Sequence, residues 1–285
     1  MTIARHGSGP GAAVRALASQ IHPVFMLPPV ASSVFGAALS GRFDVALALL
    51  HATATFFALY TAHVKDGYVD FYGRDEDDDH PLTARGCRVA MTLSTVAFAG
   101  CLAAIWLVVG PLAAAITLPG WIIGYLHAPQ FDMNPVTATV GYPSGIALAL
   151  LGGFYVQVET LTPAVLAFAG VFLTILSGIK VIDDAQDYEY DRSIDKRTVA
   201  VVVGQRSARR FAFGLMIAGL GGVVAFAAVA VFPPSAVLAA VAFGVVALLA
   251  ARADPEIATM LLIRGSYVFL AILVVAVWVE PLSAV

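Results

Sequence analysis

Two short segments of the chain are rich in aspartate and glutamate, and the spacing of these carboxylates suits a metal-binding or catalytic site. Segment 66–79 reads DGYVDFYGRDEDDD, and segment 183–195 reads DDAQDYEYDRSID. The first has two aspartates four residues apart, and the second has three aspartates spaced by three and then four, so on a helix each set would occupy one face. These five are Asp66 and Asp70 in the first segment and Asp184, Asp187 and Asp191 in the second.

Carboxylates held this closely need a cation. Like charges at i, i+4 destabilise a helix, and hard divalent cations are the best partners because Mg²⁺ typically takes one or two carboxylates together with substrate phosphates. The five aspartates are therefore predicted to bind Mg²⁺ and, through it, a diphosphate, whose departure the metal assists by stabilising the charge that builds up on it. The alternative is a solvated acidic loop, which is the usual role of an acidic run and our interpretation of residues 75–79.

The composition places these acids in a membrane protein. The chain has 285 residues, of which 60% are hydrophobic and 12% are charged, whereas soluble domains carry about 25% charged residues. A soluble enzyme, a disordered chain and a secreted disulfide scaffold are excluded on this ground. The formal net charge of −3 also excludes a broadly basic nucleic-acid binder, which needs clustered Lys and Arg.

Apolar stretches of the length that crosses a bilayer, about 17–25 residues, follow one another along the whole chain. Turn residues such as Gly110-Pro111 and Pro233-Pro234 separate them. We expect about nine transmembrane helices and one domain over residues 1–285. The predicted spans are 23–41, 43–64, 88–109, 111–127, 144–158, 164–182, 209–231, 235–251 and 256–279.

The distribution of basic residues orients these spans. With a cytoplasmic N-terminus, thirteen of the 16 Lys and Arg fall in cytoplasmic segments and Arg42 alone falls outside, while Lys180 and Arg264 lie within predicted spans. Lys and Arg are in excess in cytoplasmic loops, so the count favours an odd number of spans with the C-terminus outside. Both acidic segments follow even-numbered spans, and both are therefore expected at the cytoplasmic face.

Segment 179–204 resembles the second aspartate-rich motif of the UbiA superfamily of intramembrane prenyltransferases. That motif reads N-D-x-x-D-x-x-x-D, followed by K-R-T and V-x-x-G, and Asp183 stands where Asn is common. The matching residues are Asp184, Asp187, Asp191, Lys196, Arg197, Thr198, Val201 and Gly204.

The first acidic segment is similar to the family's first motif, N-x-x-x-D-x-x-x-D followed by a basic residue and Pro-Leu. Asp66 replaces the Asn, Asp70 matches, and His80-Pro81-Leu82 resembles the ending, while the third acid of the motif falls at Arg74. The Arg-Pro often found before the first span is His22-Pro23 here. The connection between the fourth and fifth spans contains no Lys or Arg, although many members place a basic residue there.

The resemblance implies an all-α, polytopic bundle around a central cavity with a cytoplasmic cap. It implies that a polyprenyl diphosphate binds through Mg²⁺ and ionises, and that a hydrophobic acceptor, an aromatic quinone precursor or a lipid, captures the allylic cation. Asp66, Asp70, Asp184 and Asp187 would be catalytic as metal ligands. Asp191 would be a further ligand that also contacts the substrate.

Cations and aromatic side chains near the acids are candidates for binding the substrate. Lys180 either neutralises Asp184, four residues on, or reaches the diphosphate. The cations that flank the acids would clamp the diphosphate or act as interfacial anchors; these are Lys65, Arg74, Lys196 and Arg197. Three tyrosines either shield the allylic cation by cation–π contact or simply pack; these are Tyr68, Tyr155 and Tyr188.

Two other functions compete with a prenyltransferase. A terpene cyclase of the same fold would ionise the same donor without an external acceptor. A transporter or other non-enzymatic cation-binding protein would normally show inverted repeats and broken helices at the bilayer midplane, whereas here the acids are expected at one face. The requirement for an acceptor separates the first two.

Overall fold

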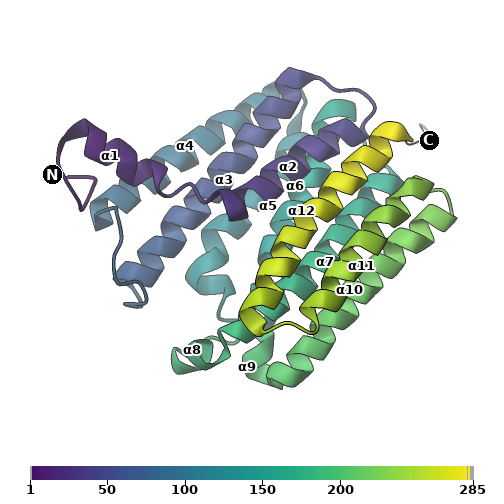
Figure 1. The fold of residues 1–285 in the computed structure, drawn as a ribbon. Helices are drawn as coiled ribbons and strands as arrows, with labels where there is room; N and C mark the ends of the chain where they lie inside the picture. Colours follow the sequence, from purple (N-terminus) through teal and green to yellow (C-terminus); the bar gives the residue numbers. More distant parts are fainter. Residues whose placement is uncertain (1, 281, 283–285) are drawn as a thin grey trace.

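The computed structural model describes residues 2–280 and 282, and its described part is built from helices, with one isolated β-bridge between Ala4 and Leu82 (Figure 1). The all-α expectation is confirmed. The long helices are α2 (Pro23–Leu39), α3 (Val45–Tyr72), α4 (Ala84–Val108), α5 (Pro111–Leu126), α6 (Pro135–Val158), α7 (Pro163–Gln186), α10 (Gln205–Ala228), α11 (Val237–Ala250) and α12 (Pro255–Val279). The short elements are α1 (Gly9–Ala18), α8 (Tyr188–Ser193), α9 (Val199–Val203), the π-turn η1 (His127–Phe131) and the 3₁₀ turn η2 (Pro234–Ala236).

Each of the nine predicted spans corresponds to one long helix, but the count of nine is not confirmed. Among the described residues, seven helices are long and apolar enough to cross a membrane. An eighth span results if α1 and α2, which are bent by 66°, are taken together, and the apolar segment Pro234–Ala250 is shorter. The fifth predicted span, 144–158, begins earlier than expected because Asn134 caps α6 and Pro135 occupies its first turn.

Close helix contacts hold the centre of the bundle together. An added Cβ on Gly36 of α2 would lie 2.0 Å from the Leu150 carbonyl oxygen of α6, and one on Gly153 of α6 would lie 2.0 Å from the Ser33 carbonyl oxygen of α2. Only glycine fits at these two positions. The main core then forms around α7, whose buried apolar side chains, among them Phe168, pack against α2, α6, α10 and α12.

Polar contacts gather the loops at the two ends of the bundle. At one end Arg74 pairs with Asp132, and Arg209 donates to the Ala250 and Ala251 carbonyls. At the other end the Asp44 backbone bonds to Gln157, and Ser235 donates to Glu280, the C-cap residue of α12. These contacts join loops that lie far apart in the sequence at each end.

Candidate functional site

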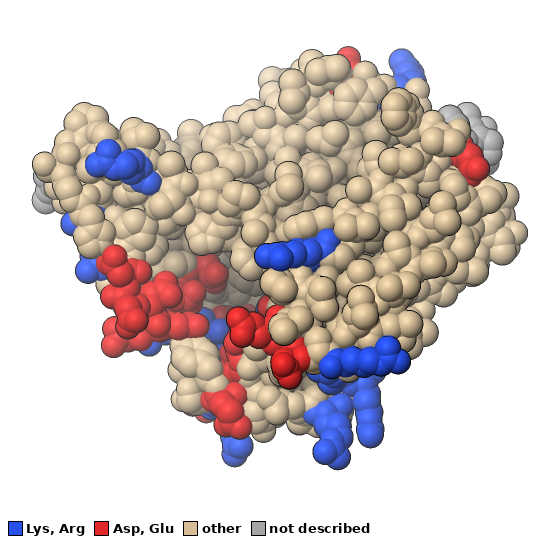
Figure 2. Space-filling view, in the orientation of Figure 1, with Lys and Arg blue, Asp and Glu red and all other residues tan. Residues whose placement is uncertain are grey.

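A cavity of about 720 Å³ opens into the bundle between α2, α3, α5, α6, α7 and α12. Its interior is mostly apolar, with Leu59, Phe98, Ile146 and Leu176 among the lining residues. Acidic side chains gather at one end of the molecule, on either side of a hollow (Figure 2). The charged residues that line the cavity are Asp66, Asp70, Asp77, Asp79, Lys180 and Asp183.

The first carboxylate set lies on the last turns of α3. This helix runs to Tyr72, past the predicted end at residue 64, so Asp66 and Asp70 occupy neighbouring turns of one helix and both line the cavity. Arg74 pairs with Asp70 at 3.4 Å and with Asp132 at 2.7 Å. Arg74, which occupies the position of the motif's third acid, thus links the end of α3 to the α5–α6 connection by two ion pairs.

Two acids of the second segment, Asp183 and Asp184, pair with Lys180 on α7. The Lys180 Nζ lies 2.5 Å from Asp184 Oδ1 and 3.2 Å from Asp183 Oδ2. The Asp184 side chain is 7% exposed, and its Oδ2 atom has no hydrogen-bond partner among the described residues. Lys180 is therefore the neutralising partner of Asp184, one of the two roles expected for it, and it also lines the cavity.

Helix α7 ends before the last two aspartates of the second set, so the prediction that all three lie on one face of one helix is wrong. α7 stops at Gln186, so Asp187 lies at the break and is exposed, while Asp191 is buried in the separate helix α8. Lys196 Nζ lies 3.5 Å from Asp191 Oδ1. Burial raises the pKa of Asp191, against the opposing charge of Lys196. The break places Asp187 and Asp191 outside the helix that carries Asp184, so the three aspartates do not share one helical face.

The two acidic segments interact across the end of the bundle. The Lys196 charge acts on Asp70 of α3 as well as on Asp184, Asp187 and Asp191. Tyr190 of α8 lies close to Glu76 in the α3–α4 loop, and desolvation together with the negative charge of Glu76 raises the Tyr190 pKa to about 12. Residues more than 100 positions apart are thus brought to one site, as the topology predicted.

Several of the predicted substrate-binding residues have other partners and are not among the described residues that line the cavity. Lys65 donates to the Tyr125 carbonyl and to Gln130 Oε1, and its ammonium lies 4.1 Å from the Tyr125 ring centroid. Arg197 is exposed. The three predicted tyrosines, Tyr68, Tyr155 and Tyr188, pack in hydrophobic clusters. Their roles in substrate binding stay predictions.

The structure adds residues that the sequence reasoning missed. Asp183 lines the cavity although it occupies the family's Asn position, and Asp132 anchors Arg74 while its Oδ1 atom is buried without a partner among the described residues. Asp77 and Asp79 are exposed, as a solvated loop requires, yet they also line the cavity mouth. The sequence did offer one indication: the connection between α5 and α6 contains Asp132 but no Lys or Arg, so a cation from another segment had to pair with it.

Two tyrosines shape the cavity wall formed by α2. Pro28 and Pro29 have no N–H groups, so the carbonyls four residues earlier lose their helical partners. Tyr267 of α12 donates its hydroxyl to the Val24 carbonyl, and Tyr142 of α6 donates to the Phe25 carbonyl at 2.8 Å. These hydroxyl protons satisfy the two orphaned carbonyls and hold the start of α2 against the cavity.

The residues present can contribute to a metal site but do not complete one alone. Across residues 2–280 and 282, no group of three or more His, Cys, Asp or Glu side chains is arranged to hold a metal ion. Mg²⁺ commonly takes only one or two carboxylates and completes its octahedron with water and substrate phosphates. The cavity-facing carboxylates and the orphaned Asp184 Oδ2 suit that kind of site.

The model of the UbiA prenyltransferase family matches residues 26–273. The chain belongs to the UbiA prenyltransferase family. It is accordingly an enzyme of the membrane, and the match covers both acidic segments. A comparison with functionally curated protein sequences finds no match.

Solved structures of UbiA homologues share the fold of this family member. The apo homologue from Aeropyrum pernix K1 has a TM-score of 0.70 at 14% identity, covering 91% of this chain and 99% of that one. A digeranylgeranylglyceryl phosphate synthase has a TM-score of 0.70 at 14% identity, covering 93% and 98%. A homologue from Archaeoglobus fulgidus bound to DMAPP and Mg²⁺ has a TM-score of 0.66 at 14% identity, covering 94% and 99%.

Proposed function

We propose that this protein transfers a prenyl group from a polyprenyl diphosphate to an aromatic or lipid acceptor inside the membrane, in a Mg²⁺-dependent reaction. The observation that carries the proposal is the polarity of the cavity, which has carboxylates at its mouth and apolar side chains deeper in. A prenyl diphosphate has the same two-part character. The Archaeoglobus fulgidus homologue, whose structures hold DMAPP or GPP with Mg²⁺, supports the same assignment.

The carboxylates at the mouth would hold Mg²⁺. Asp66 and Asp70 approach from α3 and Asp183 from α7, and the predicted ligands Asp184, Asp187 and Asp191 lie on the same side of the bundle. When bound, Mg²⁺ stabilises the negative charge of the leaving diphosphate. We propose that Lys180, which the acids hold at the cavity wall, contacts the diphosphate from the α7 side.

The remainder of the cavity would hold the prenyl chain and protect the cation. Apolar residues such as Leu59, Ile146 and Ile179 line it, so water finds few hydrogen-bond partners beside the reactive carbon. Exclusion of water favours capture by the acceptor over hydrolysis.

The site is proposed to face the cytoplasm. The end of the bundle that carries the acids also carries most of the Lys and Arg, and basic loops stay on the cytoplasmic side. On this assignment the N-terminus is cytoplasmic and Glu280 lies near the outer surface. Accessibility of a single engineered cysteine at position 78 or at position 43 to a membrane-impermeant reagent would test it.

The decisive assay uses the purified full-length protein in lipid nanodiscs with geranylgeranyl diphosphate. Diphosphate release is measured with Mg²⁺ and with excess EDTA, and with and without a phenolic or lipid alcohol acceptor. We expect release that needs both Mg²⁺ and acceptor, together with a prenylated product. Release without acceptor, accompanied by a cyclic hydrocarbon, would establish the cyclase instead, and no release with any combination would refute the proposal.

A further inference from the structure

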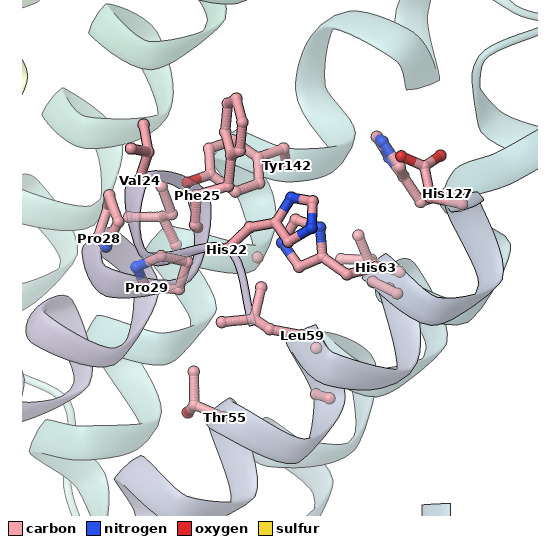
Figure 3. A pocket seen from close by; sticks show the side chains of 18 of the residues that line it. His22, Val24, Phe25, Pro28, Pro29, Thr55, Leu59, His63, His127 and Tyr142 are labelled. Carbon is pink, nitrogen blue, oxygen red and sulfur yellow. Dashed lines mark hydrogen bonds between the residues drawn. The ribbon is translucent and has the colours of Figure 1, made fainter. Parts of the chain in front are cut away.

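One wall of the cavity presents three imidazoles that come from three separate elements. His22 is the N-cap residue of α2, His63 lies on α3, and His127 begins η1 after α5. The His22 and His63 rings are stacked, with centroids 5.1 Å apart and an interplanar angle of 26°, as Figure 3 shows. All three line the cavity.

These imidazoles have unused hydrogen-bonding capacity. Within residues 2–280 and 282, none of the three side chains forms a hydrogen bond or an ion pair. A neutral imidazole offers one donor and one acceptor. The nearby hydroxyls of Tyr142, Tyr267 and Thr55 already donate to backbone carbonyls, which leaves the imidazoles as hydrogen-bond donors on this wall.

The charge around the imidazoles favours an uncharged ligand. Of the described residues that line the cavity, five are acids and only Lys180 is a cation, and its ammonium is already paired with Asp183 and Asp184. Arg74 and Lys65 are directed to Asp132 and Gln130, and Arg264 of α12 is exposed and is not among the described residues that line the cavity. A carboxylate or phosphate on the acceptor would therefore find no unpaired Lys or Arg among the described residues that line this wall.

The surfaces beside the imidazoles are flat and apolar. The Phe25 ring lies 6.3 Å from the His63 ring, and Pro28, Pro29 and Leu59 line the adjoining surface in Figure 3. Stacked rings and proline faces pack well against a planar ring, and aromatic pairs gain stabilisation beyond area burial. A hydrogen-bonding edge beside an apolar face is suited to a hydroxylated ring.

We propose that His22, His63 and His127, together with Phe25, form the acceptor subsite, and that it takes an acceptor with a neutral hydroxyl group and no carboxylate or phosphate. This inference rests on the proposed prenyl transfer and narrows its acceptor class. His22 and His63 bind the hydroxyl, and Phe25 packs against the ring. The subsite lies on the α2–α3 side of the cavity, whereas the proposed diphosphate contact Lys180 lies on α7.

A matched pair of fluorescent probes, 1-naphthol and 1-hydroxy-2-naphthoate, tests the inference because they differ by one carboxylate. Binding to the full-length protein in nanodiscs is measured without donor, and binding to empty nanodiscs is subtracted. We expect 1-naphthol to bind at least ~10-fold more tightly, which corresponds to about 1.4 kcal/mol. Equal binding, tighter binding of the carboxylate, or binding of neither probe would overturn the inference.

Substitutions of His22 provide a change of specificity that a purely structural role would not produce. His22→Phe keeps a ring against His63 but removes the hydrogen bond, and it should weaken 1-naphthol binding by about 3- to 10-fold, as expected for one neutral hydrogen bond. His22→Arg adds a cation and should improve binding of 1-hydroxy-2-naphthoate at least ~10-fold. His6→Phe, an exposed imidazole outside the cavity lining, should change neither affinity.

Donor binding separates failure of this inference from failure of the proposed function. Mg²⁺-dependent thermal stabilisation by geranylgeranyl diphosphate reports on the carboxylate mouth alone and should be retained in His22→Phe and His22→Arg. If the wild-type protein shows no such stabilisation, the proposed function and this inference both fail. If the donor stabilises the protein but His22→Arg does not bind 1-hydroxy-2-naphthoate more tightly than the wild type does, only the acceptor subsite is refuted.

Discussion

On α3, Asp66 and Asp70 both line the cavity, and only Asp70 has a cationic partner, Arg74 at 3.4 Å, among the described residues. On α7 and α8 the paired acids are more deeply buried: Lys180 lies 2.5 Å from the buried Asp184, and Lys196 lies 3.5 Å from the buried Asp191. The neighbouring Asp183 faces the cavity, whereas Asp184, Asp187 and Asp191 are not among the described residues that line it. The first set is thus open to a ligand, while much of the second holds its own segment together.

This difference separates two uses of the same residue type. Carboxylates without a firm partner are ready to bind an incoming cation, and carboxylates in buried ion pairs cannot lose their partner without leaving an unpaired charge. Motif spacing alone treats both sets as equal ligands. The contacts instead predict that substitutions in the first set change chemistry and that substitutions around Lys180 also change stability.

The largest effect is expected for Asp70→Ala, and likewise for Asp66→Ala. Each change removes a proposed metal ligand, and loss of one preorganised electrostatic contact costs about 10²–10³-fold in turnover. The measurement is Mg²⁺-dependent diphosphate release at saturating donor. Asp78→Ala is the control, since Asp78 is exposed and does not line the cavity; an equal loss in that variant would show that the first motif is misregistered.

Breaking the Lys180–Asp184 pair should have the next largest effect. Lys180→Met leaves Asp184 buried without its cation, and loss of one partner of a buried pair costs about 3–5 kcal/mol; the partial exposure of Lys180 places this case at or below the lower end. Thermal unfolding in detergent measures it. The double variant Lys180→Met, Asp184→Leu should recover part of the loss, and failure to recover any would show that the pair does not balance the buried charge.

A smaller effect distinguishes Asp183 from Asp187. Asp183→Ala is expected to lower diphosphate release at least ~10-fold, equivalent to about 1.4 kcal/mol, because its carboxylate faces the cavity. Asp187→Ala should lower release by no more than that, because Asp187 is exposed at the break after α7. The reverse order would mean that the motif register, and not the cavity lining, identifies the ligands.

The smallest effect is expected for Tyr190→Phe. The change removes the phenol hydroxyl that lies close to Glu76 of the α3–α4 loop, a contact at an exposed site, so a loss of about 1 kcal/mol or less in stability is expected. Diphosphate release should change by less than about 3-fold. A much larger loss of activity with unchanged melting would show that Tyr190 acts on the substrate.

Features of the fold that depend on hydrophobic periodicity and composition could be predicted from the sequence. Apolar length located the long helices, and the loop charges predicted that the acidic segments share one end of the bundle. The helix end at Gln186 was not predictable from spacing, since the pattern of Asp184, Asp187 and Asp191 suits a continuous helix equally well. The partners of Lys65 and Arg74 depend on the path of the α5–α6 connection, and no local pattern specifies that path.

The central claim, that the cavity carboxylates hold the metal, is tested most directly by anomalous diffraction from crystals of the full-length protein. Crystals would be grown with Mn²⁺ in place of Mg²⁺ and a prenyl thiolodiphosphate that does not ionise readily. We predict manganese peaks within about 2.3 Å of carboxylate oxygens of Asp66, Asp70 or Asp183, a distance slightly longer than that for Mg²⁺, with the diphosphate bound to the metal. Manganese bound elsewhere, with the diphosphate outside the cavity, would contradict the account.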